Sequence, residues 1–332
     1  MDLAQKIKKE FGKNLKFNEP LKNWTTFRIG GPARYFFMAE SVEDLNKAIE
    51  IAQQFKIPYF ILGEGSNLLF SDQGFGGLMI KNKISRLEII RPRRTGPRPE
   101  IIVGAGIKLA YLVINSIKFG LTGLEWAAGI PGSVGGAVYQ NAGAFGSDFS
   151  KSIQSVMILR NGKTKKLNKK ECGFAYRSSI FQKNKDIILE VELKLKKGDQ
   201  KKGQELIKKN INQRLAKQPR GFSAGSVFKN ANFKEISQKT LNTYPQLQSF
   251  KESGIISAGW LIENAGLKGL KIGGAQISEK HANFIINTGM AKAKNVLALI
   301  KTIKKRVKQK FGLEIEEEIQ QVKQSRPLTW KV

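Results

Sequence analysis

Apolar side chains recur at helical spacing in several segments of the chain. After Ser41 they recur every three or four positions up to Phe55, and Ser41 with Asp44 resembles the start of a capping box. The segment 108–120 has a similar stripe and ends on a glycine, a common helix terminator. The basic segment 201–218 predicts an amphipathic helix that ends before a proline. Further helices are predicted over 257–265 and 291–311.

Shorter apolar or alternating runs lie between these segments and predict strands. The run 57–63 is apolar and ends in a glycine turn, which is typical of a buried strand. Asn161-Gly162 between two runs indicates a hairpin, and the alternation over 186–198 predicts one long strand. The other predicted strands are 77–81, 87–90, 100–106, 273–278, 283–289 and an edge strand over 313–322. This mixture predicts an α+β fold.

The length and composition are those of a globular protein. The chain has 332 residues, of which 41% are hydrophobic, enough for two or three domains with cores of their own. No apolar run reaches the roughly 18 residues that span a bilayer, and the charged N-terminal segment lacks the apolar region of a secretory signal. The single cysteine, Cys172, excludes an intramolecular disulfide framework. We therefore expect a cytoplasmic protein with no membrane partner.

The net charge of +30 raises the question of nucleic-acid binding. The lysines are scattered over turns and polar faces, and the densest arginine cluster lies in a loop over 91–100 that is rich in proline and glycine. No zinc-finger spacing or RNP1-like strand is present. We expect a solvated basic surface and no nucleic-acid partner. The positive electrostatic field of such a surface would also speed the association of a polyanionic small substrate.

Two glycine-rich stretches, 62–72 and 128–146, carry little side-chain chemistry but can bring main-chain N–H groups close to a ligand. Each could be only a tight loop; together they favour a long ligand with a phosphate linker. Leu68 stands where the Rossmann fingerprint needs a glycine, and Met157 stands where a P-loop needs one. With one histidine, His281, an H-E-x-x-H zinc site is excluded. We expect His281 to be a packing residue, and we expect no metal site.

Six motifs in fixed order carry a family resemblance: TTFRIGGPA (25–33), LGEGSNLL (62–69), GLEWAAGIPGSVGGAVYQNAGAFG (123–146), ECGFAYRSSIF (171–181), SAGSVFKN (223–230) and GGAQISEKHANFIINTG (273–289). Over residues 21–322 the chain resembles the UDP-N-acetylenolpyruvoylglucosamine reductase family of peptidoglycan synthesis. The resemblance implies an FAD-binding fold of the vanillyl-alcohol oxidase (PCMH) type, with subdomains 1–82 and 83–200. It also implies a smaller α+β substrate domain over 201–312, and a final strand, 313–325, that returns to the first subdomain.

The resemblance also implies the ligands. FAD would be held noncovalently, since neither glycine-rich stretch contains a histidine or cysteine for covalent attachment, and NADPH would be the reductant. The small-molecule partner would be a UDP-sugar, and we expect a monomer. The cofactor contacts implied are Arg28, Gly63, Gly65, Ser66, Asn67, Gly129, Pro131, Gly132, Ser133, Gly136, Ala137, Asn141 and Ala142.

Three residues carry the implied chemistry, in which hydride adds to the enolpyruvyl group and negative charge develops beside its carboxylate. Arg177 stays cationic and can fork onto that carboxylate, and Ser226 would protonate the carbanion. Glu318 would pair with Arg177 there. Strand alternation puts Glu316 on the face of Glu318 and excludes Glu317. Without the motifs, a surface arginine, a turn serine and edge-strand glutamates are the ordinary interpretations.

The implied substrate contacts are Tyr176, Arg214, Lys217, Lys229 and Asn230. The chain departs from the family pattern at Gln320, where an arginine is usual, at Ala231, where a proline is common, and in its longer loop 91–100. The short stretch after the YRSS motif indicates the shorter subtype, which lacks a loop carrying a substrate-closing tyrosine. Two alternatives stay open: another FAD-dependent oxidase of small alcohols or sugars, and a basic RNA-binding protein.

Overall fold

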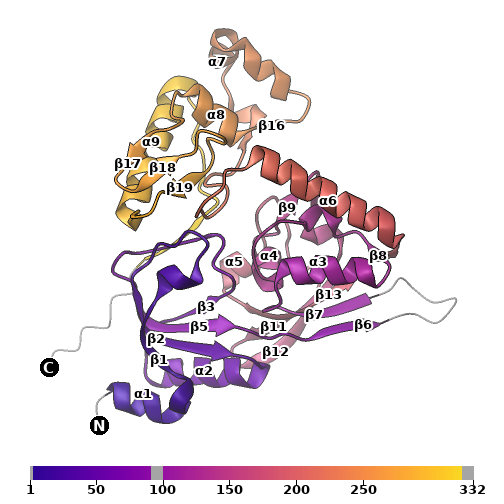
Figure 1. The fold of residues 1–332 in the computed structure, drawn as a ribbon, viewed down its shortest axis with the longest axis vertical. Coiled ribbons are helices and arrows are strands. Elements are labelled where there is room, and N and C mark those ends of the chain that lie inside the picture. Colours follow the sequence, from indigo (N-terminus) through magenta and orange to yellow (C-terminus); the bar gives the residue numbers. More distant parts are fainter. Residues whose placement is uncertain (1–2, 91–99, 324–332) are drawn as a thin grey trace.

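The computed structural model describes residues 3–90 and 100–323. Two sheets from the first two thirds of the chain lie side by side, and the C-terminal elements sit above them in the view of Figure 1. The predicted α+β class is confirmed. Most of the arginine-rich loop predicted at 91–100 falls outside the described residues. No helix of the described residues is long and apolar enough to cross a membrane.

The first sheet has the strand order β1-β2-β5-β3, with β1 antiparallel and the other pairs parallel. Its strands are β1 (Lys16–Pro20), β2 (Pro32–Ala39), β3 (Tyr59–Leu62) and β5 (Phe75–Asn82). Helices α1 (Leu3–Phe11) and α2 (Val42–Gln54) pack with it in one core. The predicted start of α2 is confirmed, since Ser41 Oγ accepts a hydrogen bond from Asp44 N at 3.1 Å. The crossover from β2 through α2 brings β3 and the glycine loop that follows it to one end of this sheet.

The second sheet is antiparallel, in the order β12-β11-β13-β7-β6. Its strands are β6 (Leu87–Ile90), β7 (Glu100–Gly104), β11 (Ile153–Arg160), β12 (Lys163–Asn168) and β13 (Ile187–Lys194). The predicted hairpin is confirmed: Asn161 and Gly162, both with positive φ, join β11 to β12. The single strand predicted over 186–198 is instead two, because β14 (Lys196–Lys197) leaves the sheet to pair with β8 (Leu121–Thr122).

The connection from β7 to β11 carries most of the small elements around the site. It contains α3 (Leu109–Lys118), η3 (Glu125–Ala127), α4 (Val134–Tyr139), β9 (Gly143–Ala144), β10 (Ser147–Asp148) and η4 (Phe149–Lys151). The helix α4 lies inside the glycine-rich stretch that was expected to be loop. Ser133 Oγ accepts from Gly136 N at 3.2 Å and so caps α4, whose apolar side chains are buried. The short α5 (Phe181–Asn184) precedes β13.

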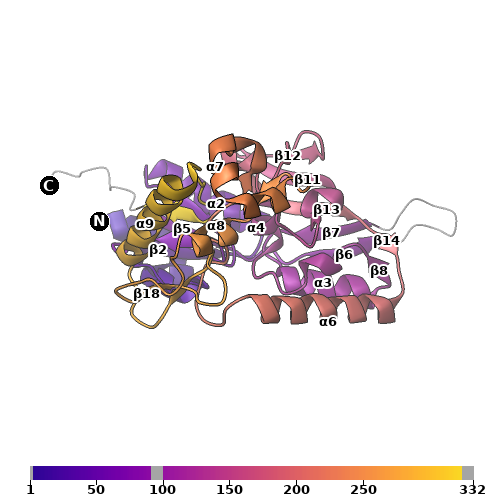
Figure 2. The same ribbon diagram turned by 90° about the horizontal axis from the view of Figure 1, so that it is seen from above.

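The remaining elements form the C-terminal part: α6 (Gln200–Lys217), β15 (Ala231–Asn232), η5 (Phe233–Glu235), α7 (Gln238–Thr243), η6 (Pro245–Phe250), β16 (Ile255–Ile256), α8 (Ala258–Asn264), β17 (Lys271–Ile272), β18 (Ala275–Ile277), β19 (Ile285–Asn287) and α9 (Ala293–Phe311). The buried face of α9 is the centre of a separate core. Figures 1 and 2 both show α6 beside α3, where Asn210 Nδ2 donates to Glu125 O at 2.9 Å. The boundaries at 82, 200 and 312 remain predictions; this packing favours moving the second to about residue 217.

The end of the described chain returns to the first subdomain. Here β20 (Gln320–Val322) pairs in parallel with β4 (Leu68–Phe70). Only these three residues of the predicted strand 313–322 form a strand with a neighbour; the rest is extended chain beside the segment 226–229. Asp72 then ties the two parts together, since its carboxylate accepts from Ala293 N at 2.6 Å and Lys294 N at 3.1 Å at the start of α9.

Candidate active site

A cavity of about 1270 Å³ opens where the two sheets and the C-terminal part meet. It exceeds the roughly 300–1,000 Å³ of a pocket for one drug-sized ligand, so it has room for a cofactor and a substrate. Its walls combine apolar side chains, such as Phe60 and Ile188, with the two glycine-rich stretches and a cluster of charged side chains.

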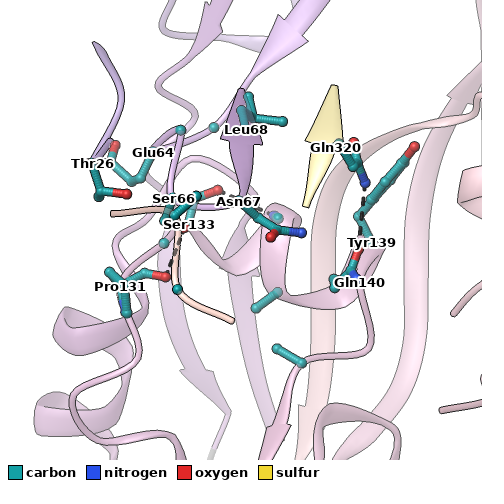
Figure 3. Close-up of a pocket in the computed structure, with 18 of the residues that line it drawn as sticks. Thr26, Glu64, Ser66, Asn67, Leu68, Pro131, Ser133, Tyr139, Gln140 and Gln320 are labelled. Atoms are coloured by element: carbon teal, nitrogen blue, oxygen red, sulfur yellow. Dashed lines mark hydrogen bonds between the residues drawn. The ribbon is translucent and has the colours of Figure 1, made fainter. Parts of the chain in front are cut away.

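The two glycine-rich stretches meet at one wall of the cavity. Ser66 Oγ donates to the Pro131 carbonyl at 2.9 Å, and Figure 3 shows these residues together with Ser133. A Cβ on Gly63 would lie 2.5 Å from Ser133 Oγ. Gly132, at φ +143°, has a conformation that favours glycine, and a Cβ there would lie 3.1 Å from Ser66 Oγ. Glycine is therefore needed for the loops to approach each other so closely.

The same loops offer unused hydrogen-bond donors. Among the interactions of the described residues, the N–H groups of Gly65, Ser66 and Asn67 donate to no protein acceptor, and neither does that of Gly132. N–H groups in such a cradle suit a diphosphate, and the apolar walls suit flat aromatic rings. The residues present thus fit FAD.

The predicted cofactor residues line this cavity, with two exceptions. Arg28 is exposed, and its guanidinium lies over the ring of Phe222 at 5.6 Å. Asn141 is buried behind the wall, where its Nδ2 donates to Ala175 O at 2.9 Å and its Oδ1 accepts from Ser150 N at 3.1 Å. Asn141 therefore braces the loop that carries Arg177.

The loop of Arg177 is held on both sides by the end of α4. Besides the bond of Asn141, the Tyr139 carbonyl accepts from Ser179 Oγ at 2.6 Å and from Gln182 Nε2 at 2.9 Å. Arg177 itself has φ +51° and donates from Nη2 to Gly143 O at 2.9 Å. These contacts fix the guanidinium in the cavity wall.

The three predicted catalytic residues, Arg177, Ser226 and Glu318, all line the cavity. Arg177 Nε and Glu318 Oε1 form an ion pair at 2.8 Å. Glu318 N donates to Val227 O at 2.8 Å, so the main chain of Glu318 lies beside the residue that follows Ser226. Residues from three distant parts of the sequence therefore meet at one place.

Burial raises the pKa of Glu318, because it disfavours the ionised form more than the charges of Arg177 and Lys229 favour it. Its side chain is 15% exposed. Such a carboxyl can hold a proton at a pH where an exposed glutamate has lost it.

The neighbouring glutamates point elsewhere. Glu316 is 78% exposed and pairs with Lys229 at 3.0 Å, outside the cavity lining. Glu317 pairs with Lys304 at 2.6 Å. Glu317 stays out of the cavity, as the predicted alternation requires, and its main chain forms an isolated bridge with Phe228. Glu316, which was predicted to share the face of Glu318, does not line the cavity either.

The five predicted substrate residues are dispersed. Only Arg214 lines the cavity; its Nε donates to Ala128 O at 2.9 Å, and its buried Nη2 has no hydrogen-bond partner in the described chain. Tyr176 accepts a long hydrogen bond of 3.4 Å from Asn230 N, and Lys229 follows Ser226 closely. Lys217 is exposed at the end of α6.

Comparison with known proteins decides what this site belongs to. The C-terminal domain of UDP-N-acetylenolpyruvoylglucosamine reductase matches residues 217–322, and an FAD-binding domain matches residues 33–168. The reductase of Carboxydothermus hydrogenoformans is 39% identical over 96% of this chain and 99% of its own length. The chain belongs to the UDP-N-acetylenolpyruvoylglucosamine reductase family.

Further members of this family agree. UDP-N-acetylenolpyruvoylglucosamine reductase 1 of Bacillus thuringiensis subsp. konkukian is 41% identical over 91% of this chain and 93% of its own. The crystal structure of the Thermus caldophilus reductase (MurB) superposes with a TM-score of 0.71 and 34% identity, covering 91% of this chain and 97% of that one. The predicted fold, an FAD-binding domain of the PCMH type with a smaller C-terminal domain, is confirmed, and so is FAD as the cofactor.

Sequence reasoning missed part of the cavity wall. Tyr139, Gln140 and Gln320 gather there (Figure 3), with Gln320 Nε2 3.5 Å from Gln140 Oε1. Burial raises the pKa of Tyr139, against a hydrogen bond with Gln320. Gln320, where the family usually has arginine, therefore takes part in a neutral cluster. The position of Tyr139 inside the glycine-rich stretch was the available signal.

The single histidine is a packing residue, as expected, and the single cysteine is buried. His281 packs edge-on against Phe284, and burial lowers its pKa. Cys172 is buried, which raises the pKa of its thiol to about 12. Neither lines the cavity, and among the described residues no cluster of potential metal ligands occurs.

Proposed function

We propose that this chain reduces the enolpyruvyl group of UDP-N-acetylenolpyruvoylglucosamine to give UDP-N-acetylmuramate, with NADPH as reductant, in peptidoglycan precursor synthesis. Membership of the reductase family supports the reaction. The observation that carries it is the meeting of Arg177, Ser226 and Glu318 beside the glycine-rich wall in one cavity.

The glycine loops would hold the cofactor, with the free N–H groups of 65–67 and 132 on its diphosphate. The chemistry that bound FAD would supply is the transfer of hydride from NADPH to the enol ether. The chain's own residues would stabilise the charge that appears on the substrate and deliver the proton.

Arg177 and Glu318 would bind the substrate carboxylate. The guanidinium is permanently cationic, and its position is fixed before substrate arrives, so it would stabilise charge that spreads into the carboxylate. A protonated Glu318 would donate a hydrogen bond to the same group instead of repelling it, in keeping with its raised pKa.

Ser226 would give the proton to the substrate carbanion. Its neighbours fix its position: Val227 N donates to Asn283 O at 2.8 Å, and Asn283 holds the main chain of Phe228 through both its amide atoms at 2.9 Å. Gly225, at φ +77°, precedes it and presents no side chain to the substrate.

The substrate diphosphate would lie toward Lys229, Asn230 and Tyr176, with Arg214 contributing its free Nη2. Lys217 would add only a distant charge, because it is exposed at the end of its helix. Arg28 would act on the cofactor only if its side chain turned away from Phe222.

Three finer points complete the proposal. The stretch between Arg177 and α6 holds only α5, β13 and β14, which supports the shorter subtype without a tyrosine-bearing lid loop. A monomer suffices, because all the proposed catalytic residues come from one chain. A cytoplasmic location would give access to NADPH.

Spectroscopy of the purified protein tests the function. We expect a yellow protein whose flavin absorption is bleached by NADPH and restored by UDP-N-acetylenolpyruvoylglucosamine, and whose colour stays in the supernatant after acid precipitation. Bleaching of the flavin by a simple alcohol or sugar, with no reoxidation by the enolpyruvyl substrate, would favour the oxidase alternative. A colourless protein that binds RNA tightly at physiological salt would favour the RNA-binding alternative.

A further inference from the structure

A buried ion pair lies directly behind the glycine loop 63–67. Lys81, on β5, is 3% exposed, and its Nζ donates to Glu64 Oε1 at 2.6 Å and to the Gly63 carbonyl at 2.5 Å. Glu64 is 23% exposed and lines the cavity, where Figure 3 shows it with Ser66 on the wall of the glycine loops. Glu64 lies within the LGEGSNLL motif, but the motif gave it no role, and Lys81 lies in none of the six motifs.

Each group favours the charged form of the other. Burial lowers the pKa of Lys81, and the hydrogen bond and charge of Glu64 oppose this. Burial acts to raise the pKa of Glu64, but Lys81 together with Lys108 and Lys83 outweighs it, and the pKa is lowered. An ion pair of this kind is costly to bury and adds little net stability to a fold. Its position beside the cofactor loop therefore needs another explanation.

The explanation lies in the charge of the ligand. A diphosphate is anionic, and a lone carboxylate one residue from Gly65 would repel it in a site shielded from water. The ammonium of Lys81 sits within hydrogen-bond distance of that carboxylate and cancels its charge, while Lys83 and Lys108 add weaker positive potential around Glu64. The same ammonium binds the Gly63 carbonyl, the acceptor dipole nearest to Glu64 in sequence.

We propose that Lys81 is a positioning residue for the cofactor diphosphate: it neutralises Glu64 and the Gly63 carbonyl, so that the free N–H groups of the loop dominate the local field. The inference rests on the proposed function only in taking FAD as the ligand. It makes the two members of the pair unequal: loss of the cation harms cofactor binding, whereas loss of the carboxylate does not.

The test compares FAD retention by the full-length holoenzyme and its variants Lys81→Met, Glu64→Gln and the double variant. Each is diluted serially, and the fluorescence of released flavin gives Kd. We expect Lys81→Met to raise Kd by about tenfold or more, because it leaves a partly buried carboxylate unpaired beside an anion. Glu64→Gln should bind FAD at least as tightly as the wild type. The double variant should return to within about threefold of the wild type.

The matched control is Lys268→Met, which removes the same side chain from the ion pair with Glu263, outside the cavity, and should leave Kd unchanged. Melting temperatures report any folding defect separately. Even if Lys81→Met folds poorly, Glu64→Gln still tests whether loss of the carboxylate leaves FAD binding intact. A double variant as weak as Lys81→Met, or a Glu64→Gln variant weakened equally, would overturn the inference. A colourless wild-type protein would instead refute the proposed function itself.

Discussion

The wall built from residues 63–67 and 129–137 presents main-chain N–H groups, whereas the wall with Arg177, Ser226 and Glu318 presents side chains. The first comes from two loops that pack against each other with no room for Cβ atoms. The second comes from three separate segments that only the complete fold brings together. A main-chain wall tolerates few substitutions by larger residues, and a side-chain wall depends on the identity of single functional groups. Substitutions in the two walls should therefore have different effects on the protein.

The largest effect is expected for Ser226→Ala, which should slow only one of the two half-reactions. Ser226→Ala should leave the reduction of flavin by NADPH near normal, because no carbanion forms in that step. Reoxidation by the enolpyruvyl substrate should slow by roughly 10² to 10⁴, the range for a placed general acid. Stopped-flow absorbance measures both steps, and Ser226→Cys, which restores a proton donor, should recover part of the rate. Equal slowing of both steps would make Ser226 a residue of the fold.

A smaller effect should distinguish Glu318 from Glu316. We expect Glu318→Gln to slow substrate reduction far more than Glu316→Gln, because Glu318 pairs with Arg177 in the cavity and Glu316 is exposed. Single-turnover reoxidation by substrate measures the difference. A worse defect in the Glu316 variant would show that the ion pair with Lys229 is the functional one.

The same variants test pH dependence. Because the pKa of Glu318 is raised in the fold, its protonated form is favoured there. Its contribution to stability is complete below the ordinary glutamate pKa of about 4.3 and is lost as pH rises through the raised value. As pH rises through this range, the loss of this contribution should lower the melting temperature of the wild type relative to that of Glu318→Gln. Glu316→Gln is the reference. Parallel curves would contradict burial as the dominant influence.

A larger side chain in the main-chain wall should weaken cofactor binding. Gly63→Ala places a Cβ 2.5 Å from Ser133 Oγ, so either Ser133 gives up its bond with Gly136 N or the loops separate, and we expect FAD to bind about tenfold more weakly. Ser133→Ala removes that contact and leaves Ser133 Cβ at an ordinary 3.6 Å, so the double variant should recover much of the affinity. Flavin fluorescence on dilution measures both. No recovery would mean that the loop spacing is set elsewhere.

The smallest effect is expected at Asp72, whose carboxylate connects the first subdomain to the start of α9 in the C-terminal part. Asp72→Asn keeps the shape of the side chain but turns one of its two acceptor oxygens into a donor, so one bond to the start of α9 is lost, and we expect a loss of about 0.5–1.5 kcal/mol in unfolding free energy. Urea denaturation measures it. Asp199→Asn, which alters a cap within one part at the start of α6, is the control for a loss of capping alone. If the Asp72 variant also raises KM for the UDP-sugar while the control does not, the tie helps to align the walls.

The difference between the walls also explains what the sequence could reveal. Glycine-rich stretches can be recognised from the sequence itself, so the cofactor wall was predictable from 62–72 and 128–146. Helices with clear periodicity, such as α2 and α9, were predictable for the same reason. Arg177 and Ser226 gained meaning only through the family resemblance, because a lone arginine or serine is ordinary.

Other features depend on tertiary contacts that no local pattern encodes. Strand alternation allows both Glu316 and Glu318 to face the cavity, and only the folded structure shows that Glu316 is 78% exposed and pairs with Lys229 outside the cavity lining. The pairing of Glu64 with Lys81 joins residues on a loop and a strand whose proximity follows from the sheet order β2-β5-β3. The helix α4 forms in spite of its glycines because its apolar residues are buried.

The pairing of β20 with β4 has a consequence for how the protein matures. Asn67 contacts Glu318 across a sequence separation of 251 residues, so this corner of the cofactor pocket cannot close until nearly all of the described chain has left the ribosome. Contacts of such high contact order form late in folding. Flavin capture should accordingly be a post-translational event, and nascent chains stalled before Gln320 should emerge colourless even with both glycine loops already synthesised.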